Sequence, residues 1–399
     1  MSAMRKQFLG AIAVIAVALA TGAWQIAGKK ASELPEPFAT PSANNRPHVI
    51  GQPESAKVAV PAGFTADVWA EGFSTPRFLL QGTHGEILLS DSGTTAGTGK
   101  IYAFPNGDPK DRKEVITGLT RPYGLALWHE YLYVGEPTSI KRFKYDAKTF
   151  TASDGQEIFS LKGDEQGHWT RSLLFDREGK KLYVGVGSAG NIEVGNEGRA
   201  AINRMNPDGT DHEIFAGGTR NPIGLHWYPG TEALWAVVQE RDALGDDLVP
   251  DYFTHIQPQG FYGYPWSYSG QIKEPRLSDH QEMIAKSLTP DLLLGAHVAG
   301  LDFAFYTAKQ FPAKYRGGAF VAFHGSWNRS KRVGYEVAFV PFKNAKPTGA
   351  PEDFLTGFMV SPDSPDVWGR PVAVFQMSDG SLLVSDDGGK KIWRVSYKG

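Results

Sequence analysis

"RPYGLALWHEYLYVGEP", Arg121 to Pro137, contains the unit from which most of the chain is built. An Arg-Pro pair leads into a short apolar run, a short turn follows, and a second apolar run ends in Gly-Glu-Pro. Short runs of Leu, Val and Tyr between turn residues are typical of buried β-strands. The stretch therefore predicts two neighbouring strands joined by a turn.

The same pattern recurs along the chain. With the stretch above, it covers residues 76–93, 121–137, 168–188, 220–242, 297–329 and 369–388. Third strands follow in segments such as "KIYAFPN" and "KIWRVSY", and fourth strands can be read in "KEVITGL" and "HEIFAGG". A spacing of roughly 45–50 residues between the early copies is typical of four-stranded propeller blades.

We therefore predict an all-β fold, a six-bladed β-propeller of four-stranded blades over residues 61–399. "FTADVWAEGF" at 64–73 has no first strand before it, so it is expected to complete the blade that ends the chain and thereby close the ring. Insertions are expected around 241–295 and 329–367. The alternative is an all-β protein of two sandwich domains.

Composition narrows the function classes. The formal net charge of −2 favours neither nucleic acid nor an anionic membrane as a partner. The chain has no Cys, which excludes disulfides, thiolate metal sites and thiol catalysis.

The N-terminal residues 1–28 resemble a targeting segment. Arg5 and Lys6 precede an uncharged stretch from Phe8 to Gly28, and Ala18-Leu19-Ala20 fits a cleavage site. This pattern predicts a secretory signal peptide and a periplasmic location, with an uncleaved membrane anchor as the alternative. Residues 29–60, rich in Pro, Ala and Ser, are expected to be a flexible lead-in.

The propeller fold converts sequence position into geometry, because loops that enter first strands and loops that leave second strands open on one face. The first set supplies Arg77, Arg121, Tyr123, His168, Arg171, Arg220, Asn221, His297 and Arg370. The second set supplies Asp91, Glu136, Ser188, Glu240, Arg241, Asp242, His324, Trp327, Asn328, Arg329, Asp386 and Asp387. All are predicted to surround one mouth of the central channel.

Several Arg side chains converge at this mouth in a chain that is nearly neutral overall. The guanidinium fork suits carboxylates and phosphates, so the set predicts a small polyanionic ligand. The alternative is that each Arg pairs with a neighbouring acid and holds the blades together.

Two further features suggest chemistry. His168 enters an inner strand and is a candidate general base, although a single His is often structural. "QERDALGDDLVPDY" at 239–252 is acidic, and oxygen ligands suit Ca²⁺, although a solvated acidic loop would have the same composition.

At these residues the chain resembles the PQQ-dependent soluble sugar dehydrogenases, particularly the sorbosone dehydrogenase-like branch. The matching elements are "GHWTRSLLF", "GTRNPIGLHW", "QERDALGDDLVPDY", "GFYGYPW", "HGSWNRS" and "GRPVAV" with "DGSLLVSDDGG". They occur in order over most of residues 60–399. The resemblance implies a six-bladed propeller that holds pyrroloquinoline quinone (PQQ), a flat molecule with three carboxylates, at the channel mouth with Ca²⁺.

The resemblance also assigns roles. It implies His168 as the base, Arg220 as a catalytic and cofactor-binding residue, and a Ca²⁺ site at Glu240, Arg241 and Asp242. The predicted cofactor-binding residues are Arg77, Tyr123, Arg171, Arg220, Asn221, Trp327, Asn328, Arg329 and Arg370. The chain departs from the glucose-oxidising branch at Gln239-Glu240-Arg241-Asp242, where that branch has Gln-Gly-Pro, and at Pro122 or Tyr123, where it has Gln. These departures bear on sugar specificity and on the Ca²⁺ ligands.

The expected function is a periplasmic PQQ- and Ca²⁺-dependent dehydrogenase of an aldose, a hexosone or a related sugar carbonyl hydrate. Its electrons would pass to a quinone or cytochrome acceptor. A metal-dependent sugar lactonase and a non-catalytic binding propeller are the alternatives.

Overall fold

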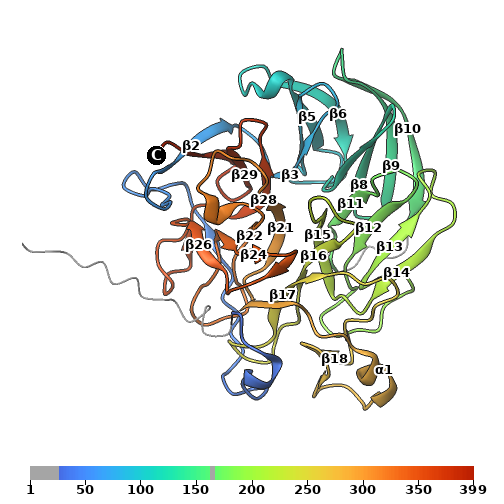
Figure 1. Ribbon diagram of the computed structural model, residues 1–399, viewed down its shortest axis with the longest axis vertical. Helices are drawn as coiled ribbons and strands as arrows, with labels where there is room; N and C mark the ends of the chain where they lie inside the picture. The colour runs from blue at the N-terminus through green and yellow to red at the C-terminus, as the bar shows by residue number, and fades with distance from the viewer. Residues whose placement is uncertain (1–26, 162–166) are drawn as a thin grey trace, which may run out of the picture.

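The computed structural model describes residues 27–161 and 167–399, in which six four-stranded antiparallel sheets form a ring (Figure 1). The first three blades are β3 (Pro76–Gln81), β4 (Ile87–Asp91), β5 (Gly99–Phe104) and β6 (Lys113–Leu119); β7 (Leu125–Trp128), β8 (Tyr131–Glu136), β9 (Ser139–Asp146) and β10 (Thr151–Ser160); and β11 (Arg171–Phe175), β12 (Leu182–Val186), β13 (Ala201–Met205) and β14 (Glu213–Gly217). The next two are β15 (Asn221–Trp227), β16 (Leu234–Gln239), β17 (Pro250–His255) and β20 (Leu292–Ala296); and β21 (Gly300–Phe305), β22 (Ala319–Phe323), β23 (Glu336–Val340) and β26 (Glu352–Leu355). The predicted fold is confirmed.

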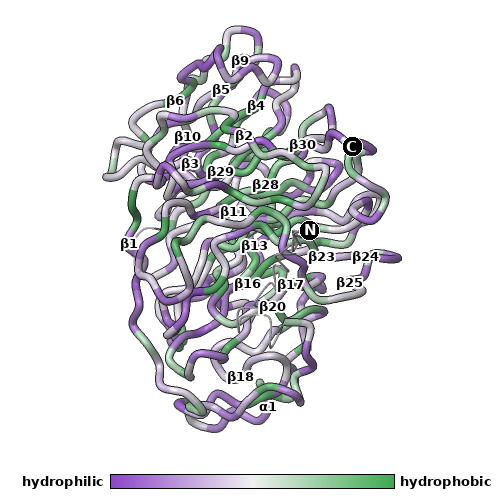
Figure 2. The backbone as a smooth tube through the Cα atoms, turned by 90° about the vertical axis from the view of Figure 1, so that its left-hand side faces the viewer, coloured by the Kyte–Doolittle hydropathy of each residue, from purple (hydrophilic) through white to green (hydrophobic). Residues whose placement is uncertain are grey.

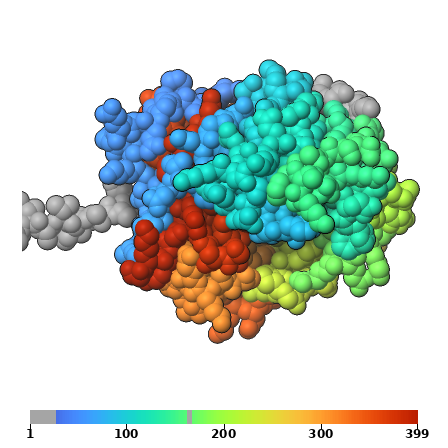
Figure 3. All heavy atoms as spheres, turned by 90° about the horizontal axis from the view of Figure 1, so that it is seen from above, coloured from blue at the N-terminus to red at the C-terminus, as the bar shows by residue number. Residues whose placement is uncertain are grey.

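The sixth blade joins the two ends of the propeller. β28 (Pro371–Gln376), β29 (Leu382–Asp386) and β30 (Lys391–Tyr397) come from the end of the chain, and β2 (Phe64–Glu71) adds the outer strand. Phe64 lies opposite Tyr397 in the β2–β30 ladder. Blue and red spheres accordingly lie side by side in Figure 3. The predicted ring closure is thus present, with β2 covering the outer edge of β30.

The first strands line the channel. Each packs against the first strand of the next blade, from β28 to β3, β7, β11, β15, β21 and back to β28. Tyr123, Ile223, Leu301 and Val372 form a buried cluster partway along the channel, and the Tyr123 hydroxyl donates a hydrogen bond to the Leu301 carbonyl at 3.2 Å. This cluster separates the two ends of the channel.

Short elements decorate the blades. β18 (Ser267–Tyr268), β19 (Ile272–Lys273) and α1 (Gln281–Lys286) lie between β17 and β20, at one end of the long axis in Figures 1 and 2. β24 (Phe342–Lys343) and β25 (Lys346–Pro347) lie between β23 and β26, and η3 (Pro105–Gly107) and η4 (Ala313–Tyr315) are single turns. The insertions therefore fall where the sequence predicts them.

Residues 29–60 are packed against the propeller, which corrects the expectation of a flexible lead-in. After η2 (Ala31–Glu33), β1 (His48–Val49) pairs in parallel with β27 (Asp366–Val367). The fully buried Arg332 donates hydrogen bonds to the carbonyl oxygens of Asn45 and Arg46 at 2.8 and 3.0 Å. The Pro-, Ala- and Ser-rich composition predicts a flexible segment, but residues far away in the sequence bind it and hold it in place.

The predicted signal peptide or anchor falls mainly on residues 1–26, which lie outside the described residues. Within the described residues, no helix is long and apolar enough to cross a membrane.

Candidate active site

Two adjoining cavities occupy the predicted mouth of the channel. The larger, about 250 Å³, is lined by residues that include Arg77, Trp169, Asn221, His324 and Arg370. The smaller, about 70 Å³, reaches Arg220, Glu240, Asp242, Asp251 and His297. His168, Gln239, Ala299 and Trp327 line both cavities. The two cavities therefore form one polar site at the starts of the first strands.

His168 is held in one tautomer. Its Nδ1 lies 3.0 Å from the Ser188 carbonyl oxygen and 3.1 Å from Ser188 Oγ. Because a carbonyl oxygen only accepts, Nδ1 carries the hydrogen, and Nε2 of the neutral ring keeps its lone pair. Burial and the nearby positive charge of Arg220 lower the pKa of His168 to about 3. The imidazole is therefore neutral at ordinary pH, because its pKa lies well below the ordinary value for His.

Gly187 allows His168 and Asn221 to approach each other. A Cβ at residue 187 would lie 2.2 Å from Asn221 Oδ1 and 2.5 Å from His168 Cβ, which is closer than real contacts allow. Any larger residue would push apart the two side chains that line the larger cavity.

Arg220 is buried and bound by the protein. Nε donates to the Asn191 carbonyl at 3.1 Å, Nη1 to the Glu240 carbonyl at 2.5 Å and Nη2 to Asn191 Oδ1 at 3.1 Å. Nη2 also lies 3.4 Å from Asp242 Oδ2. These contacts fix the guanidinium plane beside His168, so Arg220 acts as an oriented positive charge.

An acid–imidazole pair lies behind Arg220. His297 Nε2 is 3.0 Å from the Gly245 carbonyl oxygen and Nδ1 is 3.3 Å from Asp242 Oδ1, so both nitrogens face acceptors. Burial alone would lower the pKa of His297, but the hydrogen bond and charge of Asp242 raise it above its ordinary value. Burial alone would raise the pKa of Asp242, but His297 and Arg220 lower it. His297 and His168 thus have opposite shifts in one site.

Glu240 and Arg241, two of the predicted metal residues, bond to each other, and the Arg241 side chain leaves the site. Glu240 Oε2 accepts from Arg241 Nε at 2.9 Å, while Glu240 Oε1 is buried without a hydrogen-bond partner. The Arg241 guanidinium is directed away from the cavity, to the carbonyl oxygens of Pro265 and Ser267 at 2.9 and 2.7 Å. No group of three or more His, Cys, Asp or Glu side chains that could hold a metal occurs in residues 27–161 and 167–399. Of the three predicted metal residues, Glu240 and Asp242 line the smaller cavity, and the Glu240 side chain is fully buried beside Arg241.

On the opposite wall, Arg77 and Arg370 surround a His–Asp pair. Asp387 accepts from His324 Nε2 at 2.9 Å and forms an ion pair with Arg77 at 3.0 Å. Arg370 Nε donates to the His324 carbonyl at 3.2 Å. Burial and the charge of Arg370 lower the pKa of His324 to about 4. Arg77 and Arg121 also stack on Trp169, with their guanidinium carbons 5.0 and 3.9 Å from the ring centre.

Four residues predicted to bind the cofactor do not line these cavities: Tyr123, Arg171, Asn328 and Arg329. Tyr123 lies in the cluster that closes the channel. Arg171 donates to the carbonyl oxygens of His168 and Pro137, at 2.8 and 2.6 Å, and so braces the loop that carries His168.

Asn328 and Arg329 connect loops to one another. Asn328 bonds the Ala43 carbonyl and the Ala243 amide, at 2.6 and 2.8 Å. Arg329 forms an ion pair with Asp247 at 2.9 Å. In each of these cases a neighbouring loop supplies a partner that fixes the side chain away from the channel.

Acids at the ends of second strands also face their own blades. Asp91 accepts from the backbone amides of Ser74 and Thr75, Glu136 from Thr120, and Asp386 from Arg370. These bonds cap the loop that enters each first strand. The acid that ends the repeat is therefore structural in these three blades.

Gln239, Asp251 and Trp169 belong to the site but are not among the individually predicted site residues, although Gln239 and Asp251 lie in the predicted acidic stretch 239–252. Gln239 accepts from Asn221 Nδ2 at 3.0 Å, and Asp251 accepts from the amides of Glu240 and Ala299 at 2.8 and 2.7 Å. Burial raises the pKa of Asp251 to about 7. Gln239 and Trp169 adjoin residues that the repeat pattern selects, so a wider window around each loop would have included them.

Fold and site together define the class: a six-bladed propeller with an arginine- and histidine-rich channel mouth. Residues 58–256 and 267–398 match the TrAA12-like family, and the chain belongs to this family. It is 29% identical over 357 residues to an uncharacterised protein of Borreliella burgdorferi, covering 86% of this chain and 92% of that protein. It is 24% identical over 328 residues to a pyrroloquinoline quinone-dependent pyranose dehydrogenase of Coprinopsis cinerea, covering 70% of this chain but 44% of that protein.

Solved structures agree on the fold. The PQQ domain of the Coprinopsis cinerea pyranose dehydrogenase aligns with a TM-score of 0.73 at 22% identity, covering 86% of this chain and 98% of that domain. A calcium structure of the Trichoderma reesei family AA12 enzyme gives 0.75 at 21% identity, covering 88% and 99%. The soluble aldose sugar dehydrogenase of Escherichia coli gives 0.62 at 16% identity, covering 84% and 99%. The chain thus shares its propeller fold with a PQQ-dependent pyranose dehydrogenase, a family AA12 enzyme and a soluble aldose sugar dehydrogenase.

Proposed function

We propose that this protein is a PQQ- and Ca²⁺-dependent dehydrogenase that oxidises an aldose, a hexosone or a related sugar carbonyl hydrate in the periplasm. The observation that carries the proposal is His168, whose Nδ1 is anchored on Ser188 and whose Nε2 is left as a proton acceptor in a cavity between arginines. The signal-like residues 1–28 support the compartment.

The residues present fit the cofactor. Arg77 and Arg370 line the larger cavity and Arg220 the smaller, a set that suits a molecule with three carboxylates. Arg77 Nε, Asn221 Oδ1 and Glu240 Oε1 are buried without a hydrogen-bond partner in the protein, and a polar ligand would satisfy such atoms. Trp169 and Trp327 offer flat apolar faces beside them.

Each residue then has a role. PQQ, when bound, supplies the two-electron acceptor. His168 Nε2 accepts the proton of the sugar hydroxyl whose carbon is oxidised, and Ser188 keeps the ring oriented. Arg220 holds a fixed positive charge beside the reacting oxygens, in a buried position where charge acts strongly. Glu240, Asp242 and the Arg241 backbone would hold Ca²⁺ through oxygen ligands. A separate quinone or cytochrome then takes the electrons.

Reconstitution tests the proposal. Residues 27–399 are titrated with PQQ in the presence of Ca²⁺, Mg²⁺ or a chelator. Reduction of a dye is then followed with a panel of aldoses and hexosones as substrates. We expect tight PQQ binding with Ca²⁺, and dye reduction that depends on both the sugar and PQQ. Binding without any dye reduction would indicate a binding propeller, and failure to bind PQQ would refute the proposal.

A further inference from the structure

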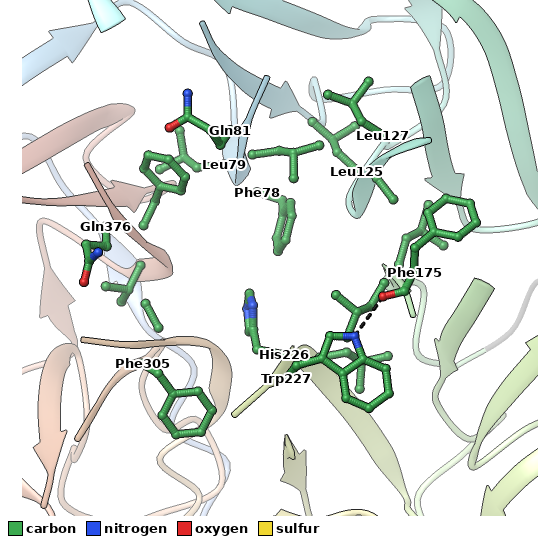
Figure 4. Close-up of a pocket in the computed structure, with 18 of the residues that line it drawn as sticks. Phe78, Leu79, Gln81, Leu125, Leu127, Phe175, His226, Trp227, Phe305 and Gln376 are labelled. Carbon is green, nitrogen blue, oxygen red and sulfur yellow. Dashed lines mark hydrogen bonds between the residues drawn. The ribbon is translucent and has the colours of Figure 1, made fainter. Parts of the chain in front are cut away.

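The far end of the channel holds a second and larger cavity. It measures about 440 Å³ and is lined by the last residues of all six first strands (Figure 4). Phe78, Leu125, Phe175, Leu225, Phe305 and Val374 represent one residue from each strand. The volume lies within the range of about 300–1,000 Å³ that is typical of small-molecule sites, which are mainly apolar with a few placed polar groups.

His226 is the polar group that this cavity leaves available. Its side chain is 29% exposed and lies near the middle of the lining residues in Figure 4. Nε2 lies 2.8 Å from Oδ1 of the buried Asp302. Because a carboxylate accepts, Nε2 donates, and Nδ1 of the neutral ring carries a lone pair. No protein partner of Nδ1 is found among the described residues.

The other polar side chains of the cavity already have partners. Gln81 Nε2 donates to the Glu86 carbonyl at 3.1 Å, and Trp227 Nε1 donates to the Phe175 carbonyl at 2.8 Å. Gln376 Oε1 accepts from the Thr307 amide at 2.7 Å. A ligand would therefore meet mainly apolar walls, with His226 Nδ1 as an oriented acceptor among them.

Aromatic rings flank that acceptor. The Phe78 ring is nearly parallel to the His226 ring, at 17° and 6.3 Å between centres, and Phe303 meets it edge-on at 4.8 Å. Phe78 lines the cavity, and flat apolar molecules suit such an aromatic wall because ring pairs gain from offset and edge-on packing beyond area burial. A hydroxyl on the molecule would supply the donor that Nδ1 lacks.

We propose that this cavity binds a neutral aromatic molecule with one hydroxyl group, a phenol in chemical class, whose hydroxyl donates to His226 Nδ1. The site is separate from the mouth, because the Tyr123 cluster lies between them. It does not depend on the proposed dehydrogenase function.

The test compares 4-methylphenol with 1,4-dimethylbenzene, which has nearly the same shape but no hydroxyl. Both are titrated into the protein with ¹³C-labelled Leu methyl groups, observed by NMR. We expect the phenol to bind about five- to tenfold more tightly, the worth of one neutral hydrogen bond.

Two variants locate the site. The paired replacement His226→Leu with Asp302→Leu removes the acceptor without leaving a buried charge, and it should abolish the preference. Leu127→Trp keeps the His–Asp pair but fills the cavity, and it should weaken both ligands at least tenfold. Ile214→Trp, on the outer strand β14, is the matched control and should change neither.

The outcomes decide the proposal. It is overturned if neither compound shifts the Leu methyl signals of the cavity, or if Leu127→Trp leaves both affinities unchanged. It is also overturned if the preference for the phenol persists in the paired variant.

Discussion

The two ends of the channel are made from the same six strands, yet they hold opposite kinds of surface. Where the first strands begin, Arg, His and Asn side chains find partners on the loops that leave second strands. Where the same strands end, Leu and Phe meet across the channel and one His faces them. Position along the strand therefore decides the chemistry, because the loops around the mouth supply hydrogen bonds to its several buried charges.

The largest expected effect tests whether the polar mouth does the chemistry. His168→Gln should lower turnover by roughly two to four orders of magnitude, the usual worth of a positioned base, while PQQ affinity stays near the wild-type value. Sugar-dependent dye reduction at saturating PQQ gives the first quantity and a PQQ titration the second. Near-normal turnover would make His168 a structural residue.

Arg220→Ala should lower both PQQ affinity and turnover, since one guanidinium serves both. Removing a buried charge that several acceptors hold should also reduce the free energy of unfolding by about 3 kcal/mol. Arg220→Lys keeps the charge but not the fork, so it separates the two contributions. Unfolding curves and PQQ titrations measured on both variants make the comparison. If Arg220→Ala binds PQQ as tightly as the wild type, the assigned binding role is wrong.

The far end should respond in the opposite way. Phe305 packs against Tyr228, Trp235 and Phe253. Its replacement by Ala should therefore lower the free energy of unfolding by about 3 kcal/mol. Turnover per folded molecule should stay within twofold, because the Tyr123 cluster lies between this end and the mouth. Denaturant unfolding and dye reduction on one preparation provide both values. A large loss of turnover in the folded variant would mean that the two ends are coupled.

The smallest effect concerns pH. The pKa of His168 is about 3 in the folded protein and about 6.5 in the unfolded chain. The unfolded chain therefore takes up a proton as pH falls below 6.5 while the folded protein does not, so this group destabilises the fold in acid and has no effect above pH 6.5. The free energy of unfolding of His168→Gln, minus that of the wild type, should therefore rise by about 2 kcal/mol when the pH is lowered from 7.5 to 5. A stability difference that does not change with pH would contradict the shift.

The propeller could be predicted from the sequence because its signals are local and repeated. Each blade carries its own apolar runs and turns, and the unpaired strand at 64–71 identifies the closing blade. The mouth could also be located, since strand order alone brings the loops of His168, Arg220 and Arg370 to one face.

Side-chain direction could not be predicted in the same way. Arg241 and Arg220 both lie at the mouth in sequence terms, but Arg241 is drawn to carbonyl oxygens of the insertion at 265–267. Asp386 and Asp387 are adjacent, yet one caps a loop and the other forms an ion pair with Arg77 at the larger cavity. These choices depend on partners supplied by distant segments, which no local pattern reveals.

The joining of β2 to β30 also has a consequence for how the molecule is made. During synthesis β2 emerges well before its partner β30, because all the other blades lie between them in the sequence. Until then Phe64 lacks Tyr397 as well as Phe311, Tyr315 and Phe354, which pack against its ring. An open sheet edge and a bare aromatic ring are features that chaperones recognise and that favour aggregation. The blade that closes the ring can therefore form only after β30 has been synthesised, so the aromatic cluster around Phe64 is assembled late.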